Sequence, residues 1–148
     1  MIGLNSIGAG TGMYVRYNKV SRRLEFGPES AGYRIGVCNE ASGVETVTMT
    51  DCSLILGYLN PDYFLGGNIP LDKKRAYKYI KEQLADPFGV DPERTARGAL
   101  DLIEINMKNH LNGMIQGLGF RPENYTLISF GGAGPLHVAG YARELKFQ

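Results

Sequence analysis

The fold is best predicted from residues 128–137, which have the sequence Ile128-Ser129-Phe130-Gly131-Gly132-Ala133-Gly134-Pro135-Leu136-His137. An apolar run over 125–130 leads into the glycines and predicts a buried strand, and residues 137–146 predict a helix. Glycine turns the backbone tightly because it has no Cβ, and it leaves bare main chain against which a flat ligand can lie. Since the first N–H groups of a helix lack partners, this arrangement suits a nucleotide or an anion. The alternative is a tight strand-to-helix connection without a ligand, which the Gly-Gly pair alone favours.

The length and charge of the chain limit the number of domains and the kinds of partner that it can have. With 148 residues it is long enough for one domain with a proper core and too short for two comfortable ones. Sixteen basic and fifteen acidic residues leave a net charge of +1, so no strong field attracts nucleic acid or an acidic membrane surface. No apolar run approaches the roughly 20 residues of a membrane helix, and no secretion signal is visible. We therefore expect no nucleic-acid partner, no membrane and a cytoplasmic location.

Two cysteines, Cys38 and Cys52, are too few for a disulfide framework. We expect each to be a small buried hydrophobic residue with a reduced thiol. A metal site would need further ligands, and the two histidines, His110 and His137, lie far away in the sequence. The sequence therefore predicts no metal site in this chain.

The hydrophobic pattern changes near residue 50. Residues 1–50 form a glycine-rich β segment, in which short alternating or β-branched runs predict strands over 13–17, 24–26 and 44–48. Residues 51–148 form a helical segment that ends in the strand, glycine turn and helix described above. We expect an α/β fold, with α+β as the alternative, and one compact unit completed by a partner subunit.

Capping residues and prolines predict where the helices of the second segment begin and end. Asp51 predicts the cap of a short helix, and Asp72 caps another that ends before Pro87. Asp91 precedes a proline at the first helical position, and apolar residues then recur every three or four positions. This pattern predicts a long helix over 92–116.

Four segments are similar, in this order along the chain, to signatures of the hydantoinase A/5-oxoprolinase family. They are residues 6–12 (Ser6-Ile7-Gly8-Ala9-Gly10-Thr11-Gly12), 27–32, 59–67 and 130–137. Because these matches cover nearly the whole chain, the resemblance is far more specific than any one of them. Further short stretches, such as residues 30–34, are closest to the ATP-dependent ketone carboxylases that act on acetone and acetophenone.

The resemblance implies a part of an actin/sugar-kinase/heat-shock ATPase-like fold, whose nucleotide lies between two lobes. In such proteins an Asp-Gly-Gly-Thr-type loop in each lobe holds the phosphates, and a later Gly-Gly segment holds the adenosine. No Asp is followed by Gly anywhere in this sequence. The chain therefore resembles the C-terminal portion of such a subunit, and we expect larger carboxylase subunits to carry both phosphate loops.

The resemblance also implies which residues contact ATP. Adenosine would lie against the backbone of Gly131, Gly132, Ala133 and Gly134, with Pro135 fixing the start of the helix. His137 could donate a hydrogen bond to the ribose or bind a partner carboxylate; the alternative is packing or exposure to solvent. Mg²⁺ or Mn²⁺ would accompany ATP and be bound mostly by the partner subunit. The sequence assigns no catalytic residue.

Two further groups of residues have a functional and a structural interpretation. Residues 8–12 resemble a phosphate-binding loop, but no Lys-Ser/Thr pair follows, so a tight hairpin or a contact between lobes is favoured. Glu29, Ser30 and Arg34 form either a substrate or subunit contact, or a surface turn whose polar groups bind one another.

Three functions remain open at this point. The favoured one is a small subunit of an acetophenone-type ketone carboxylase complex, which uses ATP and bicarbonate to carboxylate a ketone and in which this chain alone is inactive. The second is a subunit of an ATP-dependent hydantoinase or 5-oxoprolinase. The third is a non-catalytic assembly subunit.

Overall fold

The computed structural model describes residues 8–147, and the mixed α/β class predicted from the sequence is confirmed. Two compact units are present, one formed by Gly10–Leu100 and one that contains Asp101–Gln148. The change of pattern near residue 50 therefore falls inside the first unit, and the boundary between the two units falls within a helix. Ser6 and Ile7 of the first family signature lie outside the described residues.

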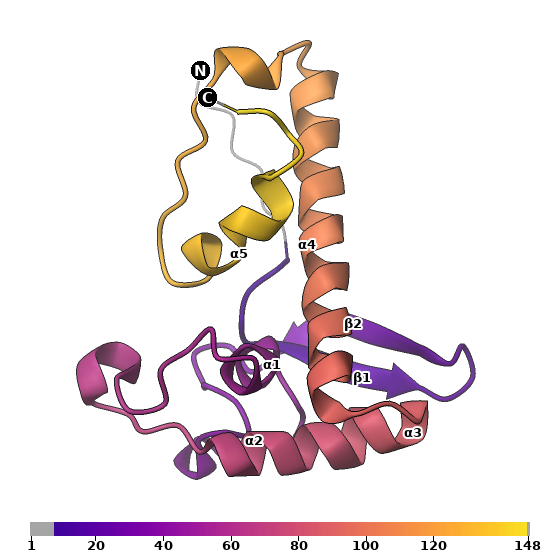
Figure 1. The fold of residues 1–148 in the computed structure, drawn as a ribbon, viewed down its shortest axis with the longest axis vertical. Helices are drawn as coiled ribbons and strands as arrows, with labels where there is room; N and C mark the ends of the chain where they lie inside the picture. Colours follow the sequence, from indigo (N-terminus) through magenta and orange to yellow (C-terminus); the bar gives the residue numbers. More distant parts are fainter. Residues whose placement is uncertain (1–7, 148) are drawn as a thin grey trace. The chain divides into compact units, whose positions relative to one another are not determined.

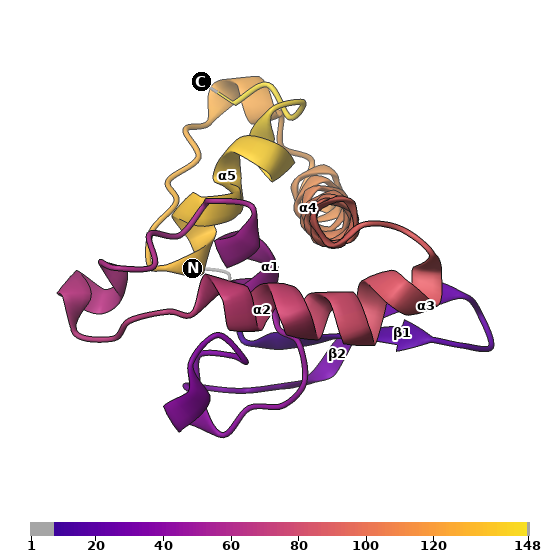
Figure 2. The same cartoon turned by 60° about the horizontal axis from the view of Figure 1, so that its bottom comes forward.

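The first unit contains an antiparallel hairpin of strands β1 (Met13–Asn18) and β2 (Arg23–Ser30), at the two segments where alternation predicts strands. Val15 pairs with Phe26, and the side chain of Val15 is fully buried. Figure 1 shows the hairpin, and Figure 2 shows α2 and α3 running beside it.

The strand predicted over residues 44–48 does not form. Only one bridge joins Tyr14 to Thr48, although the N–H of Val15 also donates to the carbonyl oxygen of Val47 at 2.8 Å. Thr48 is the N-cap of α1 (Met49–Ile55), so the chain leaves the extended conformation as soon as it reaches the sheet. Asp51, predicted as the cap itself, is instead the third helical residue of a capping box with Thr48.

Helix α2 (Lys73–Ile80) begins after Asp72 as predicted, since the Asp72 carboxylate accepts the N–H of Arg75 at 2.9 Å. The predicted end before Pro87 is wrong. A wide π-helical turn over Lys81–Ala85 leads into α3 (Asp86–Phe88), and Pro87 lies in the first turn of α3, where it needs no N–H partner. The helix ends at Gly89, whose φ of 70° is left-handed.

A buried carboxylate ties the loop before α1 to that helix. The Asp51 carboxylate accepts the backbone N–H groups of Val37 at 3.2 Å, Cys38 at 2.8 Å and Thr48 at 2.8 Å, and also the Thr48 hydroxyl at 2.8 Å. Asp51 is fully buried. Four donors satisfy the carboxylate, so its burial is compatible with a stable core.

Helix α4 (Pro92–Gly117) matches the predicted helix over 92–116. The Asp91 carboxylate accepts the N–H of Arg94 at 2.9 Å, so the predicted cap is also confirmed. In the first unit, the buried side chains of Ala96, Ala99 and Leu100 form the packed face of this helix.

The second unit contains the rest of α4, a 3-10 turn (Pro122–Asn124) and α5 (Ala133–Ala142). The strand predicted over 125–130 is wrong for this structure, because these residues belong to no strand or bridge. A strand needs a neighbour to pair with; the N–H of Tyr125 donates to the Pro122 oxygen in the preceding turn, and no other backbone hydrogen bond joins this segment to the described residues. The last helix begins at Ala133, inside the glycine segment, and not at residue 137 as predicted.

We predict that Gly36→Ala lowers the free energy of unfolding by about 2–3 kcal/mol, because a Cβ at Gly36 would lie 2.6 Å from Oγ1 of Thr48 and 2.8 Å from both carboxylate oxygens of Asp51. Urea denaturation monitored by circular dichroism measures the change. Gly98→Ala in α4 is the control: its Cβ meets no atom within 4 Å, so stability should rise, by up to about 1 kcal/mol. Equal stabilities of the two variants would contradict the prediction.

Candidate functional site

The predicted nucleotide segment is an exposed turn that enters α5. Gly131 has a left-handed φ of 87°, and Gly132 is the N-cap residue of α5. Both are exposed, whereas Ala133 and Gly134 are half-buried in the first helical turn. Pro135 is the third residue of α5, not the first as expected. The turn thus presents bare backbone at the start of a helix.

The glycines of this turn lack a side chain for different structural reasons. Gly131 requires its left-handed backbone, and a Cβ at Gly134 would lie 3.0 Å from Oγ of Ser129. Gly132 has an ordinary φ of −82°, and a Cβ there would meet nothing within 4 Å. No contact among the described residues therefore explains why position 132 lacks a side chain. Space beside this backbone is what a flat ligand needs.

His137 points into the second unit. Its side chain is 2% exposed, and its Nδ1 lies 3.3 Å from Oε1 of Glu104 on α4. A Cβ at Gly140, one turn further along α5, would collide with the same carboxylate. Glycine at 140 thus leaves room for Glu104 to reach His137. This geometry favours a positioning role for His137, which holds α5 against α4, over direct contact with a ligand.

The loop at residues 8–12 is anchored through the carbonyl oxygens of Thr11 and Gly12. The carbonyl oxygen of Thr11 accepts the N–H and the hydroxyl of Thr50 at 2.9 and 3.1 Å. The carbonyl oxygen of Gly12 accepts the N–H of Ala31 at 2.7 Å, and a Cβ at Gly12 would lie 2.9 Å from the Gly32 oxygen. These contacts support the structural interpretation, a close approach of two backbones.

The polar residues of the 29–34 segment do not form one cluster. Glu29 forms an ion pair with Arg16 at 2.6 Å across the hairpin, and the Ser30 hydroxyl accepts the N–H of Gly32 at 3.1 Å. Arg34 instead donates through Nε to the Ala31 oxygen at 3.4 Å. Each polar group thus has its own local partner, as in a surface turn.

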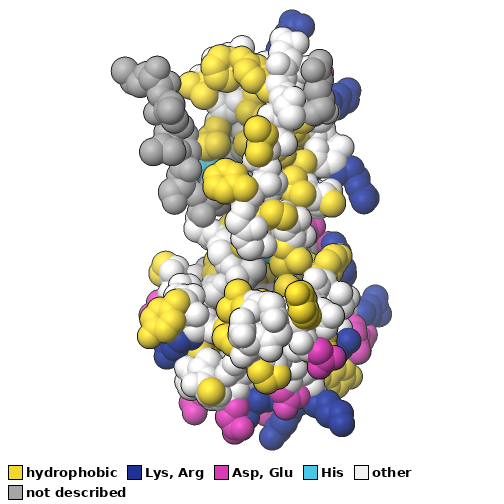
Figure 3. Space-filling view, turned by 90° about the vertical axis from the view of Figure 1, so that its left-hand side faces the viewer, with side chains coloured by type: hydrophobic (Ala, Val, Ile, Leu, Met, Phe, Trp, Pro, Cys, Tyr) yellow, Lys and Arg dark blue, Asp and Glu magenta, His cyan; other side chains and the backbone are white. Residues whose placement is uncertain are grey.

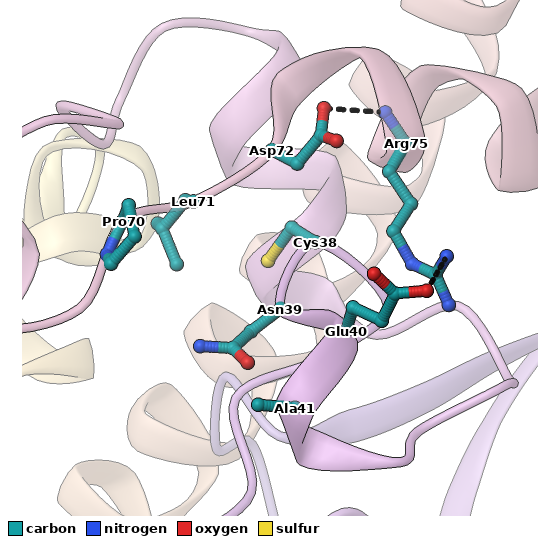
Figure 4. Close-up of a pocket in the computed structure, with 8 residues that line it drawn as sticks. All are labelled: Cys38, Asn39, Glu40, Ala41, Pro70, Leu71, Asp72 and Arg75. Atoms are coloured by element: carbon teal, nitrogen blue, oxygen red, sulfur yellow. Dashed lines mark hydrogen bonds and ion pairs between the residues drawn. The ribbon is translucent and has the colours of Figure 1, made fainter.

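Sequence reasoning missed a hollow of about 600 Å³ in the first unit, lined in part by Cys38, Glu40 and Arg75 (Figure 4). The Arg75 guanidinium already donates to the Val37 oxygen at 2.8 Å and lies 3.4 Å from the Glu40 carboxylate. Burial, together with nearby Asp51, raises the pKa of the Cys38 thiol well above its usual range. The thiol is therefore a poor nucleophile, and the arginine is committed to internal partners.

The cysteines and possible metal ligands remain apart. Cys38 and Cys52 are buried free thiols, as predicted. Within residues 8–147, no group of three or more His, Cys, Asp or Glu side chains could hold a metal ion. The described residues thus do not fit an Mg²⁺ or Mn²⁺ site of their own. In the same part of the chain, no helix is long and apolar enough to cross a membrane.

We predict that Gly140→Ala displaces the Glu104 carboxylate and breaks its contact with His137, because the new methyl group occupies the carboxylate's position. Stability should fall by about 1–2 kcal/mol, and the amides of α5 should exchange faster with deuterium. Gly113→Ala in α4 is the matched control in the same unit: its Cβ would meet nothing within 4 Å, so the exchange rates in α5 should stay unchanged. The prediction fails if both variants retain the wild-type exchange rates in α5.

Several curated proteins match nearly all of this chain. It is 45% identical over 148 residues to the acetone carboxylase β subunit of Xanthobacter autotrophicus. It is 40% identical over 141 residues to the acetophenone carboxylase γ subunit of Aromatoleum aromaticum, and 36% identical over 146 residues to the caprolactamase α subunit of Pseudomonas jessenii. These matches cover 100%, 95% and 98% of this chain, but only 21%, 19% and 21% of the relatives. The chain thus spans about a fifth of their length.

Solved structures agree with the sequence matches. A nucleotide-free acetone carboxylase structure matches 97% of this chain, and 20% of its own, with a TM-score of 0.94 and 47% identity. The ATP-dependent caprolactamase of P. jessenii matches 99% of this chain, and 21% of its own, with a TM-score of 0.86 and 34% identity. The hydantoinase/oxoprolinase family model matches residues 1–148. The chain therefore belongs to the hydantoinase/oxoprolinase family and is homologous to subunits of ketone carboxylases.

Proposed function

We propose that this chain is part of an ATP-dependent ketone carboxylase and supplies the adenosine-side wall of its ATP cleft. The observation that carries the proposal is Gly132, an exposed glycine whose missing side chain no contact in the described structure explains. Identities of 45% and 40% to acetone and acetophenone carboxylase subunits support the class of substrate.

The wall consists of backbone. The flat base of ATP lies against Gly131 and Gly132, where no side chain projects. Helix geometry leaves the N–H groups of Ala133 and Gly134 without intrahelical acceptors, so they are available to a polar atom of the ribose or the base. Pro135 has no N–H to offer, and His137 holds α5 in place through Glu104.

The rest of the cleft belongs to a larger polypeptide. Bicarbonate is a poor electrophile and the enol of a ketone is scarce, so phosphorylation of either activates the reaction. Phosphoryl transfer needs in-line positioning and neutralisation of charge by loops and a metal ion. The sequence contains no Asp-Gly pair for a phosphate loop, and the described residues hold no metal cluster. We therefore assign the phosphate loops and the metal ion to the larger polypeptide and expect this chain to be inactive alone.

The second candidate function is ATP-dependent opening of a cyclic amide. It is favoured by the 36% identity to the P. jessenii caprolactamase subunit and by the TM-score of 0.86 to that enzyme. The same wall would serve either reaction, because adenosine contacts do not depend on which oxygen receives the phosphoryl group. The higher identity to the carboxylases makes the ketone the first choice.

We predict that Gly132→Leu raises the KM for ATP at least about tenfold, because the side chain fills the space of the adenine (about 1.4 kcal/mol of binding). The assay uses the X. autotrophicus acetone carboxylase, with this chain replacing the matching region of the β subunit. Size-exclusion chromatography verifies assembly, and Gly98→Ala is the control variant. An assembled enzyme with unchanged ATP turnover would favour the third function, a non-catalytic assembly module.

The substrate class can be tested with the native complex of this chain. We expect ATP hydrolysis to rise on addition of acetone or acetophenone together with bicarbonate, and radiolabelled bicarbonate to enter an acid-stable product. Hydantoin, 5-oxoproline and caprolactam are the matched comparison substrates. Stimulation by a cyclic amide and not by a ketone would replace the first candidate function with the second.

A further inference from the structure

Residues 126–130 have the alternation of a β-strand, although they form none in this structure. Leu127 and Ser129 are half-buried: Leu127 lines a hollow of about 420 Å³ shared with α5, and Oγ of Ser129 lies 3.5 Å from the Tyr141 hydroxyl. Ile128 and Phe130 are 78% and 85% exposed. Side chains of a strand alternate between two faces, so one face of this segment already packs on α5 and the other is bare.

The backbone of this segment is also unpaired within the described part of the chain. No backbone hydrogen bond joins residues 126–130 to any of residues 8–147. The segment carries no charge or proline, the features with which exposed strand edges usually avoid pairing. Its side of the second unit faces the viewer in Figure 3, where hydrophobic side chains are exposed. An uncharged segment with an unpaired backbone and one bare apolar face is suited to pair with another strand.

We propose that residues 126–130 become a β-strand by pairing with a strand of the larger polypeptide that carries the phosphate loops. The identity of this partner rests on the proposed function; the pairing itself rests on the alternation, exposure and unpaired backbone of the segment. The relatives are about five times longer than this chain, so each contains ample chain to cover the bare face. A second copy of this chain is the competing occupant.

Pairing would also fix the candidate nucleotide turn. The segment ends at Phe130 and continues directly into Gly131, whose backbone sets the direction of the turn. A paired strand holds its end residue in a fixed position, while an unpaired segment does not. The adenosine wall would then be rigid only in the assembled enzyme, which explains why an isolated chain would bind ATP weakly.

The test measures exchange of individual amides with deuterium in the full chain by NMR. The probe is the X. autotrophicus acetone carboxylase β subunit lacking the region that matches this chain. We expect the amides of 126–130 to exchange rapidly in the free chain. On addition of the probe, at least alternate amides should slow by roughly 100-fold, because one edge of a strand presents every second N–H.

Two pairs of variants separate strand pairing from general apolar adhesion. Ile128→Pro removes an N–H and should abolish binding of the probe, while Ile128→Thr keeps the N–H and should weaken binding less. Phe130→Ser should weaken binding, and Tyr33→Ser, at a position that is 98% exposed in the first unit, should not. Circular dichroism verifies that each variant retains the fold, which is expected because Ile128 and Phe130 are largely exposed.

Each outcome supports or overturns the inference. Slowed amides together with the proline effect support it. No binding of the probe, binding without slowed amides, or equal effects of Ile128→Pro and Ile128→Thr overturn it. Slowed amides in the chain alone, increasing with its concentration, assign the edge to a second copy and also overturn it. If pairing occurs but the reconstituted enzyme binds no ATP, the proposed function fails and the pairing stands.

Discussion

The first unit depends on the buried carboxylate of Asp51. Its two oxygens accept hydrogen bonds from N–H groups of a loop more than ten residues away and from the start of its own helix. The loop and α1 therefore cannot separate without leaving the carboxylate unsatisfied. The same loop is also bound to α2. Its Val37 oxygen accepts a hydrogen bond from Nε of Arg75, and its Cys38 oxygen accepts one from the N–H of Asp72. The starts of two helices, α1 and α2, are therefore both tied to one short loop.

The second unit is held differently. Few of its described side chains are buried, and several polar pairs join α4, α5 and the segments on either side of α5. His137 contacts Glu104, Glu144 forms an ion pair with Lys108, and Ser129 lies beside Tyr141. Exposed ion pairs contribute little stability, so this unit gains less from folding than the first. The candidate nucleotide turn thus lies in the part of the chain that would benefit most from a partner.

The sequence predicted the helix starts that depend only on contacts between residues close together in the chain. The caps at Asp72 and Asp91 and the long helix after Pro92 follow from side chains that bind N–H groups three residues away. Two predicted strands, over 44–48 and 125–130, did not form because a strand depends on a neighbour that its own sequence does not specify. The capping box of Thr48 could have been read from its spacing to residue 51. Its link to residues 37–38, and the contact of His137 with Glu104, depend on packing that no short pattern contains.

The structure explains some glycines by contacts or backbone conformation within the chain, and leaves one without such an explanation. Gly36 and Gly140 are explained by carboxylates that occupy the position of a side chain, and Gly131 by its left-handed backbone. No partner molecule is needed to explain these three glycines, because contacts or backbone conformation within the chain account for each of them. Gly132 has neither a strained backbone nor, among the described residues, an atom within 4 Å of the position of a Cβ. The open space beside Gly132 is what the proposed adenosine wall requires. The turn that contains it leads into a helix whose first N–H groups lack intrahelical acceptors, and the adenosine wall that we propose would use both the space and these N–H groups.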